Sequence, residues 1–168
     1  IIVDKPDAPQ TELRIGRISA AANLRYAIVH RDSPVELEPY HTLRWTELPD
    51  AYVHHALLRA LFEDRPLVQA LSDSAPTLDV EVTAFEEVRG AGPAGRVALR
   101  YVLQDDTHVL LRGTVAVNKP ASSAEIESIV AAIRAAMVDA TSQLADRITL
   151  ALEHRAPRGP EDQQAAAR

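Results

Sequence analysis

Six histidines are the residues of this chain that most readily suggest metal or acid–base chemistry: His30, His41, His54, His55, His108 and His154. His54 and His55 are adjacent on a predicted helix, so their side chains point about 100° apart and cannot easily share an ion. A helical zinc site of the H-E-x-x-H type needs two histidines four residues apart, and that spacing is absent. Structural or surface roles explain these histidines better, and we predict no metal site.

Nucleophilic catalysis would need a serine or threonine on a sharp turn with a base beside it. The G-x-S-x-G signature of such a turn is absent from the sequence. Turn and capping roles account for the serines in turns and at helix ends, which are Ser33, Ser72, Ser74, Ser122 and Ser123. Asp50 and His54, four residues apart on a predicted helix, are either a solvated pair or part of a hydrolase site. A hydrolase that uses Asp50 and His54 or His55 therefore stays open as an alternative.

The glycine-rich segment GAGPAG at residues 90–95 does not have the context of a phosphate-binding loop. Such a loop is followed by Lys and Ser or Thr at the start of a helix, whereas strand-like alternation follows here. We predict a hairpin loop. The 168 residues contain no cysteine, which excludes a disulfide, a thiolate metal ligand and a cysteine nucleophile among them. These observations together predict neither an enzyme activity nor a cofactor.

Trp45 is the only tryptophan of the chain, and it lies in the segment YHTLRWTELP, where a predicted strand gives way to a predicted helix. A lone tryptophan is most often a buried packing anchor. Trp, Tyr and Arg also dominate the energetics of protein interfaces, so the segment is equally a candidate binding surface. We name Tyr40, Arg44, Trp45 and Tyr52 as candidate partner-binding residues and keep both interpretations.

Length and composition indicate one globular domain of 168 residues, with 46% hydrophobic and 25% charged residues. The net charge of −6 argues against a basic surface for nucleic acid. No apolar run approaches the ~20 residues of a membrane-spanning helix. Residues 1–154 are predicted to form the domain, and residues 155–168 a mobile tail. Because the chain begins with Ile1, we expect it to have been cut from a longer precursor together with any signal segment.

Hydrophobic periodicity predicts the elements that must position these residues. Seven segments show strand-like patterns: residues 13–18, 24–31, 35–45, 67–68, 78–84, 97–103 and 109–117. Two segments show helical periodicity, one from Pro49 to Asp64 and a longer one that ends at Leu152. Ser122 and Glu125 have the spacing of a capping box at the start of the long helix.

These elements predict an α+β fold, in which a mainly antiparallel sheet is covered on one face by two amphipathic helices, the C-terminal one long. Residues 49–76 could supply one parallel crossover, which would be right-handed. The apolar stripe of the long helix is interpreted as the face that packs on the sheet, with a partner helix as the alternative. Binding of a small apolar ligand would require a pocket of a few hundred Å³ beside Met137 and Leu144.

The order and spacing of these segments resemble the ABC-type transport auxiliary lipoproteins, the family that includes paraquat-inducible protein C. The resemblance covers residues 24–152. Its most specific parts are LRWTELP at residues 43–49 and the strand LDVEVTAFE at residues 78–86. The hairpin VALRYVLQDDTHVLLRGT and the long closing helix follow in the same order.

What the resemblance implies is an accessory protein without catalytic residues. Such proteins are lipid-anchored, usually to the outer membrane of Gram-negative bacteria, and face the periplasm. They accompany lipid transport systems that combine an inner-membrane ABC transporter with proteins carrying mammalian-cell-entry (MCE) domains. The expected partners are an MCE-domain protein and, through an N-terminal lipid anchor, the membrane; nucleic acid is not expected. Self-association into a ring around the conduit is compatible with this role.

The lipobox cysteine that carries the anchor in this family is absent from the sequence. We expect it to have been removed with the signal peptide, upstream of Ile1. Three functions therefore remain after the sequence: a docking lipoprotein, a module for a small apolar ligand, and the hydrolase described above.

Overall fold

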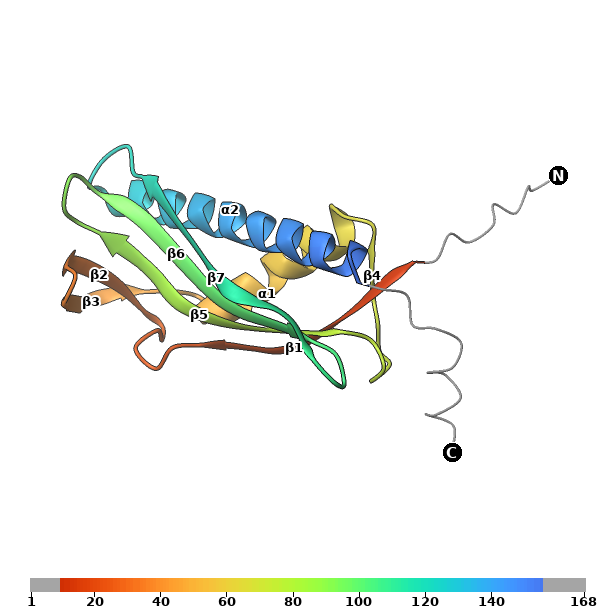
Figure 1. Cartoon of the computed structure of the whole chain (residues 1–168). Helices are drawn as coiled ribbons and strands as arrows, with labels where there is room; N and C mark the ends of the chain where they lie inside the picture. The colour runs from red at the N-terminus through yellow and green to blue at the C-terminus, as the bar shows by residue number, and fades with distance from the viewer. Residues whose placement is uncertain (1–9, 156–168) are drawn as a thin grey trace, which may run out of the picture.

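A computed structural model describes residues 10–155 (Figure 1). In chain order the elements are β1 (Thr11–Ala20), β2 (Ala27–Ser33), β3 (Glu36–Arg44), α1 (Pro49–Leu58), the π-helical turn η1 (Arg59–Glu63), β4 (Leu67–Gln69), β5 (Thr77–Val88), β6 (Ala94–Gln104), β7 (Val109–Pro120) and α2 (Ile126–Glu153). The predicted strands and both predicted helices are present, with ends that differ by a few residues. Apart from Arg155, the predicted mobile tail lies outside the described residues.

The sheet is built around β5, which has β6 along one edge and two shorter strands in succession along the other. β1 runs parallel to the first half of β5, with Ala20 opposite Val82. β2 runs parallel to the end of β5, with Arg31 opposite Val88. β4 continues the sheet beyond β1, while β3 pairs with β2 and β7 pairs with β6.

The sheet is mixed, so the prediction of a mainly antiparallel sheet is wrong. Among the described residues the β1–β5, β2–β5 and β1–β4 pairs are parallel, and the β2–β3, β5–β6 and β6–β7 pairs are antiparallel. α1 and η1 lie in the connection that returns the chain to β4, parallel to β1. Alternation reports which face of a strand is buried, and it is the same for both strand directions. The direction depends on partners that are distant in sequence, which the pattern does not contain.

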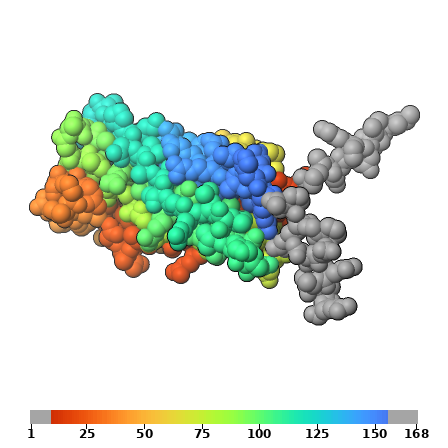
Figure 2. All heavy atoms as spheres, viewed as in Figure 1, coloured from red at the N-terminus to blue at the C-terminus, as the bar shows by residue number. Residues whose placement is uncertain are grey.

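The two helices cover one face of this sheet, as predicted. α2 lies along β6 and β7, and its blue surface borders the green of β7 in Figure 2. β5 turns Leu78, Val80 and Val82 into the core, while the side chains between them are only half-buried. The opposite face is polar, and it carries the ion pair of Arg100 with Glu81. A helix layer on one face and solvent on the other accounts for the period-two pattern of the strands.

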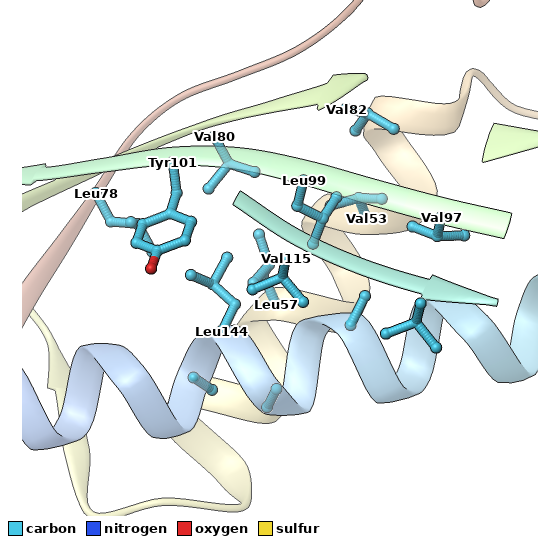
Figure 3. Close-up of a cluster of buried hydrophobic side chains, with 14 of the residues drawn as sticks. Val53, Leu57, Leu78, Val80, Val82, Val97, Leu99, Tyr101, Val115 and Leu144 are labelled. Atoms are coloured by element: carbon cyan, nitrogen blue, oxygen red, sulfur yellow. The ribbon is translucent and has the colours of Figure 1, made fainter. Parts of the chain in front are cut away.

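The core lies between this sheet and the helices (Figure 3). Val53 and Leu57 reach it from α1, Leu144 from α2 and Leu99 from the sheet, and all four are fully buried. A side chain of this size contributes about 1.5–3 kcal/mol when it is removed from water. The segment between β3 and α1 is therefore held against a tightly packed core.

Gly95 allows α2 to approach β6 closely. A Cβ atom at this position would lie 2.3 Å from the backbone nitrogen of Ile133, which is closer than any real contact. The glycine predicted to belong to a hairpin loop is therefore the second residue of β6 and a packing position. The close approach brings the Ile133 turn of α2 against the sheet.

The helix ends differ from the predicted caps. Glu125 is the N-cap of α2 and makes no side-chain capping bond, so the predicted capping box is wrong. The Ser122 hydroxyl instead contacts the hydroxyl of Ser128 at 3.0 Å. α1 begins at Pro49 with Asp50 in its first turn, where a carboxylate favours the positive end of the helix dipole. Neither helix within residues 10–155 combines the length and apolarity needed to cross a bilayer.

Candidate binding pocket

Trp45 lies at the junction of β3 and α1, where the chain turns over the edge of the core. Its backbone N–H donates to the Tyr26 carbonyl at 2.6 Å, which fixes the start of the turn. The indole packs edge-on against Phe85 and Tyr52, with ring centroids 5.1 and 6.0 Å away. The side chain is only half-buried, and its Nε1 is buried without a hydrogen-bond partner. Trp45 is thus both a packing residue and part of the surface.

The indole forms one wall of an open pocket of about 240 Å³. The first half of α2 contributes four of the lining residues, and the others come from β2, from the end of β3 and the turn after it, from α1 and from β5. The lining residues are Ile28, Arg44, Trp45, Thr46, Tyr52, Phe85, Val130, Ile133, Arg134 and Met137. The lining contains two arginines and no acidic residue. An apolar cavity with a few polar groups is the usual character of a binding pocket.

The polar groups inside this pocket are of two kinds. The hydroxyls of Thr46 and Tyr52 lie 2.6 Å apart and share one hydrogen bond. The guanidinium groups of Arg44 and Arg134 are on exposed residues and form no hydrogen bond or ion pair within residues 10–155. The pocket therefore offers an apolar interior and two uncompensated positive charges.

A second, shallower hollow of about 670 Å³ adjoins the pocket along the outer side of α2 and shares Val130 and Arg134 with it. Its floor includes Ala131, Ala135 and Val138, and Val138 is 54% exposed. The ion pair of Lys119 with Asp139 closes its far side. The apolar surface thus continues from the pocket along the helix.

Tyr40 does not belong to this pocket. Its hydroxyl donates to the Glu87 carboxylate and accepts a hydrogen bond from Arg89 at 2.8 Å. The Arg89 guanidinium also lies 5.5 Å from the centre of the Tyr40 ring, in a cation–π contact. Burial, reinforced by the hydrogen bond to Glu87, raises the pKa of the Tyr40 hydroxyl above its ordinary value. Tyr40 therefore belongs to a closed ion network.

A second, separate group of paired charges surrounds the neighbouring carboxylate on β5, that of Glu86. Glu86 is 1% exposed, and its Oε1 accepts from Nε of Arg31 at 2.8 Å, with Arg96 at 3.8 Å. The hydrogen bond and charge of Glu86 raise the pKa of Arg31, although burial opposes them. A buried charge of this kind needs a partner to be tolerated, so the network is a structural one. We call these two groups together, Arg31 with Glu86 and Tyr40 with Glu87 and Arg89, the β5 ion network.

The structure thus brings together three of the four predicted binding residues, Arg44, Trp45 and Tyr52, and separates Tyr40 from them. The α2 side of the pocket was predicted only at Met137; Leu144 is fully buried in the core and does not line it. The β5 ion network was not predicted. Its sequence signal is the pair of adjacent glutamates after Phe85, which breaks the alternation of the strand and is followed by an arginine.

The hydrolase alternative finds no support in the described residues. Asp50, His54 and His55 line an open depression that contains no serine, and the hydroxyl of its threonine, Thr46, is hydrogen-bonded to Tyr52 and to neither histidine. The two imidazole rings are 6.2 Å apart, and none of the three side chains forms a hydrogen bond or an ion pair in residues 10–155. A dyad needs its base oriented by a neighbour and aimed at a nucleophile, and neither condition is met here.

One group of side chains has the composition of a metal site. Potential ligand atoms of His30, Asp32 and Glu38 lie within 4.8 Å of one another. The Nδ1 atom of His30 is already bound to Asp32 at 2.9 Å, and both carboxylates belong to exposed residues. This hydrogen bond accounts for the short distance between His30 and Asp32, so no ion is needed to explain it.

A family model described as the ABC-type transport auxiliary lipoprotein component matches residues 3–149. No match was found among curated proteins. The matched range includes β1 through most of α2, so it contains both the Trp45 pocket and the β5 ion network.

Solved structures of low sequence identity share the fold. A crystal structure of a Xanthomonas campestris protein assigned to the DUF330 family matches with a TM-score of 0.76 and 24% identity, over 98% of this chain and 94% of that one. A structure of an uncharacterized protein matches with a TM-score of 0.73 and 16% identity, over 83% and 92%. A hypothetical protein of Chlamydia trachomatis matches at 0.52 and 10%, over 86% and 96%. At these identities the likeness concerns the fold alone.

Proposed function

The chain belongs to the ABC-type transport auxiliary lipoproteins, and on that premise we propose that it docks the conduit of an MCE-domain lipid transporter at the outer membrane of a Gram-negative bacterium. Membership of this family indicates an accessory role in ABC transport and a location in the bacterial cell envelope. In this proposal the protein faces the periplasm and is held at the membrane by a lipid anchor upstream of this chain. Its task is attachment, so it requires a rigid contact surface and no reactive group.

The observation that carries the proposal is the surface around Trp45. Arg44 is exposed, and Trp45 and Tyr52 are half-buried at the mouth of the pocket. Partly exposed aromatic rings beside an arginine are the composition typical of interface hot spots. The rings are held by Phe85, which is 3% exposed, so they lose little conformational entropy when a partner binds.

The arrangement of the ends supports the same proposal. β1 begins at the end of the molecule where α2 finishes, and the β2–β3 hairpin lies at the opposite end (Figure 1). An anchor that precedes β1 would leave the hairpin end pointing away from the membrane. A tether of this kind also raises the effective concentration of the docking surface near a partner in the same envelope.

The experiment is a direct binding measurement between this domain and a purified MCE-domain protein from the same bacterium. Arg44→Glu is expected to raise the dissociation constant at least about tenfold, which corresponds to 1.4 kcal/mol. Arg112→Glu, on an exposed residue of β7, makes the same charge change away from the pocket and should leave binding unchanged. Absence of binding by the unmodified domain, or equal loss in both variants, would reject docking through this surface.

The anchor and the membrane are tested separately in cells. The full-length precursor is expected to incorporate an acyl label and to fractionate with the outer membrane. A precursor that takes up no label would contradict the lipoprotein anchor. Self-association into a ring stays a prediction, and the mass of the anchored protein by light scattering in detergent tests it.

A second candidate function, binding of a small apolar ligand, is favoured by one specific observation. The pocket of about 240 Å³ beside Met137 has an apolar interior at the interface of α2 and the sheet, as that function requires. The volume is slightly below the roughly 300–1,000 Å³ typical of small-molecule sites. It is large enough for a single alkyl chain and leaves the head group of a ligand at the mouth.

A further inference from the structure

We infer that the Trp45 pocket binds the acyl chain of an anionic amphiphile, with Arg44 and Arg134 pairing with its head group. The inference rests on the apolar-ligand function proposed above and names the chemical class of that ligand. It does not depend on docking to a transporter. The shared chemistry is a single alkyl chain that carries a carboxylate or a phosphodiester.

The interior of the pocket selects for an alkyl chain. Ile28, Phe85 and Ile133 are almost fully buried at its base, and Val130 and Met137 are half-buried along the α2 wall. The hydroxyls of Thr46 and Tyr52 share one hydrogen bond, so each already has a partner within the lining. A peptide backbone would bring N–H and C=O groups that need partners when they are buried. A methylene chain brings none, so it is the better fit.

The mouth of the pocket selects for negative charge. The chain as a whole carries a net charge of −6, yet the pocket lining holds two arginines and no carboxylate. Elsewhere in the fold, Arg31, Arg65 and Arg89 are paired with acidic side chains. The planar fork of a guanidinium binds a carboxylate or phosphate oxygen pair with two parallel hydrogen bonds. Arg44 and Arg134 are therefore placed to receive the head group of a chain inserted beside them.

The wall between interior and mouth contains an unsatisfied donor. The Nε1 of Trp45 is buried without an acceptor in the structure. Unpaired buried donors are rare in folded proteins because they forfeit a hydrogen bond to water. The indole also lines the pocket, so it meets any ligand that enters. Ligand entry should therefore change the environment of the indole directly.

Intrinsic fluorescence provides the test, because Trp45 is the only tryptophan and it lines the pocket. The domain is titrated below the critical micelle concentration with laurate and with lauroyl lysophosphatidylglycerol, which present the two anionic heads. Monolaurin, lauroyl lysophosphatidylcholine and dodecyltrimethylammonium provide neutral, zwitterionic and cationic heads on the same chain length. We expect a saturable emission change with both anions and at least about tenfold weaker binding of the other three.

The variants locate the effect. Arg44→Gln and Arg134→Gln should each weaken laurate binding about tenfold and leave monolaurin binding unchanged. Arg112→Gln is the matched control for charge and should behave as the unmodified protein. Val130→Phe fills the α2 side of the pocket and should weaken every amphiphile, with melting and circular dichroism confirming that the variant is folded. Comparing laurate with the lysophospholipid then identifies which head group is preferred.

Three results would overturn the inference. Equal affinity for neutral, cationic and anionic amphiphiles would reject the role of the arginines while leaving the apolar-ligand function intact. No saturable change in emission with any amphiphile would reject both the role of the arginines and the apolar-ligand function. Tighter binding of an apolar peptide with a C-terminal carboxylate than of any amphiphile would assign the pocket to a protein segment instead.

Discussion

Tyr40 and Trp45 lie five residues apart in the chain, yet they belong to regions of opposite character. Tyr40 is part of the β5 ion network, in which each charged group has a partner of opposite charge or a hydrogen bond. Trp45 borders a pocket where, among residues 10–155, two guanidinium groups have no partner and one buried N–H has no acceptor. Both regions contain aromatic rings and arginines, so composition alone does not distinguish them.

The difference lies in how completely the polar groups are satisfied. A closed network gains little from a ligand, because its polar groups already have partners. Substituting one of its members leaves a buried charge unpaired, which lowers the stability of the fold. An incompletely satisfied pocket has free energy available for binding, and its residues contribute less to stability. Substitutions in the two regions should therefore separate effects on folding from effects on binding.

The largest expected effect on stability is at Glu86 in the ion network. Glu86→Gln leaves Arg31 and Arg96 without their buried carboxylate and should lower the free energy of unfolding by about 3 kcal/mol. Urea unfolding measures this. Glu38→Gln, on an exposed residue of the neighbouring hairpin, should stay within about 0.5 kcal/mol. If the two variants were equally stable, the network would not have the structural role assigned here.

The second largest effect on stability is expected at Trp45, for which the sequence allows two interpretations, a packing residue and a binding residue. Trp45→Ala removes a ring packed on Phe85 and Tyr52 and should cost about 2 kcal/mol, less than a fully buried aromatic residue. Trp45→Phe keeps most of the packing and removes only an unsatisfied N–H, so its loss should be below about 1 kcal/mol. An unchanged melting temperature in Trp45→Ala, together with lost partner binding, would make the residue purely a hot spot.

Tyr40→Phe is expected to have a smaller effect that depends on pH. The variant removes a hydroxyl that binds Glu87 and Arg89 and should cost about 1–2 kcal/mol at neutral pH. Because the pKa of Tyr40 is raised in the folded state, the native protein keeps this proton above pH 10, where the unfolded chain loses it. The free energy of unfolding should therefore fall as the pH rises beyond 10.

Urea unfolding of both proteins between pH 9 and pH 11 isolates this contribution, because the other titrating groups are common to both. The unmodified protein should lose more stability than Tyr40→Phe over this range. Parallel pH profiles would show that the hydroxyl has the same pKa in the folded and unfolded states.

The smallest effect on stability is expected at the mouth of the pocket. Arg44→Gln and Arg134→Gln should change the free energy of unfolding by no more than about 0.5 kcal/mol, since neither side chain has a partner in the described residues. Thermal melts of the two variants and of Glu86→Gln under identical conditions give the contrast. A loss above about 1 kcal/mol at either arginine would mean that the pocket is a structural region like the ion network.

Local features of the sequence predicted most of the elements and part of the site. The alternation of Leu78, Val80 and Val82 placed them on the core face of a strand, and Pro49 marked the beginning of α1. The segment around Trp45 was identified because the residue types are unusual in a chain with 4% aromatic residues. The prediction of a capping box was wrong because the Ser122 hydroxyl forms a hydrogen bond with Ser128 instead of capping the helix backbone.

The sequence by itself determined the faces of the strands, the two helices, the family and the segment that carries Arg44 and Trp45. These properties follow from local periodicity and from short motifs. Only the tertiary structure decided that β1 and β2 run parallel to β5, that Arg134 lines the same pocket as Arg44, and that Tyr40 is hydrogen-bonded to Glu87 and Arg89. The physical reason is that strand direction, charge pairing and the satisfaction of buried donors depend on residues brought together from distant parts of the chain, about which local patterns carry no information.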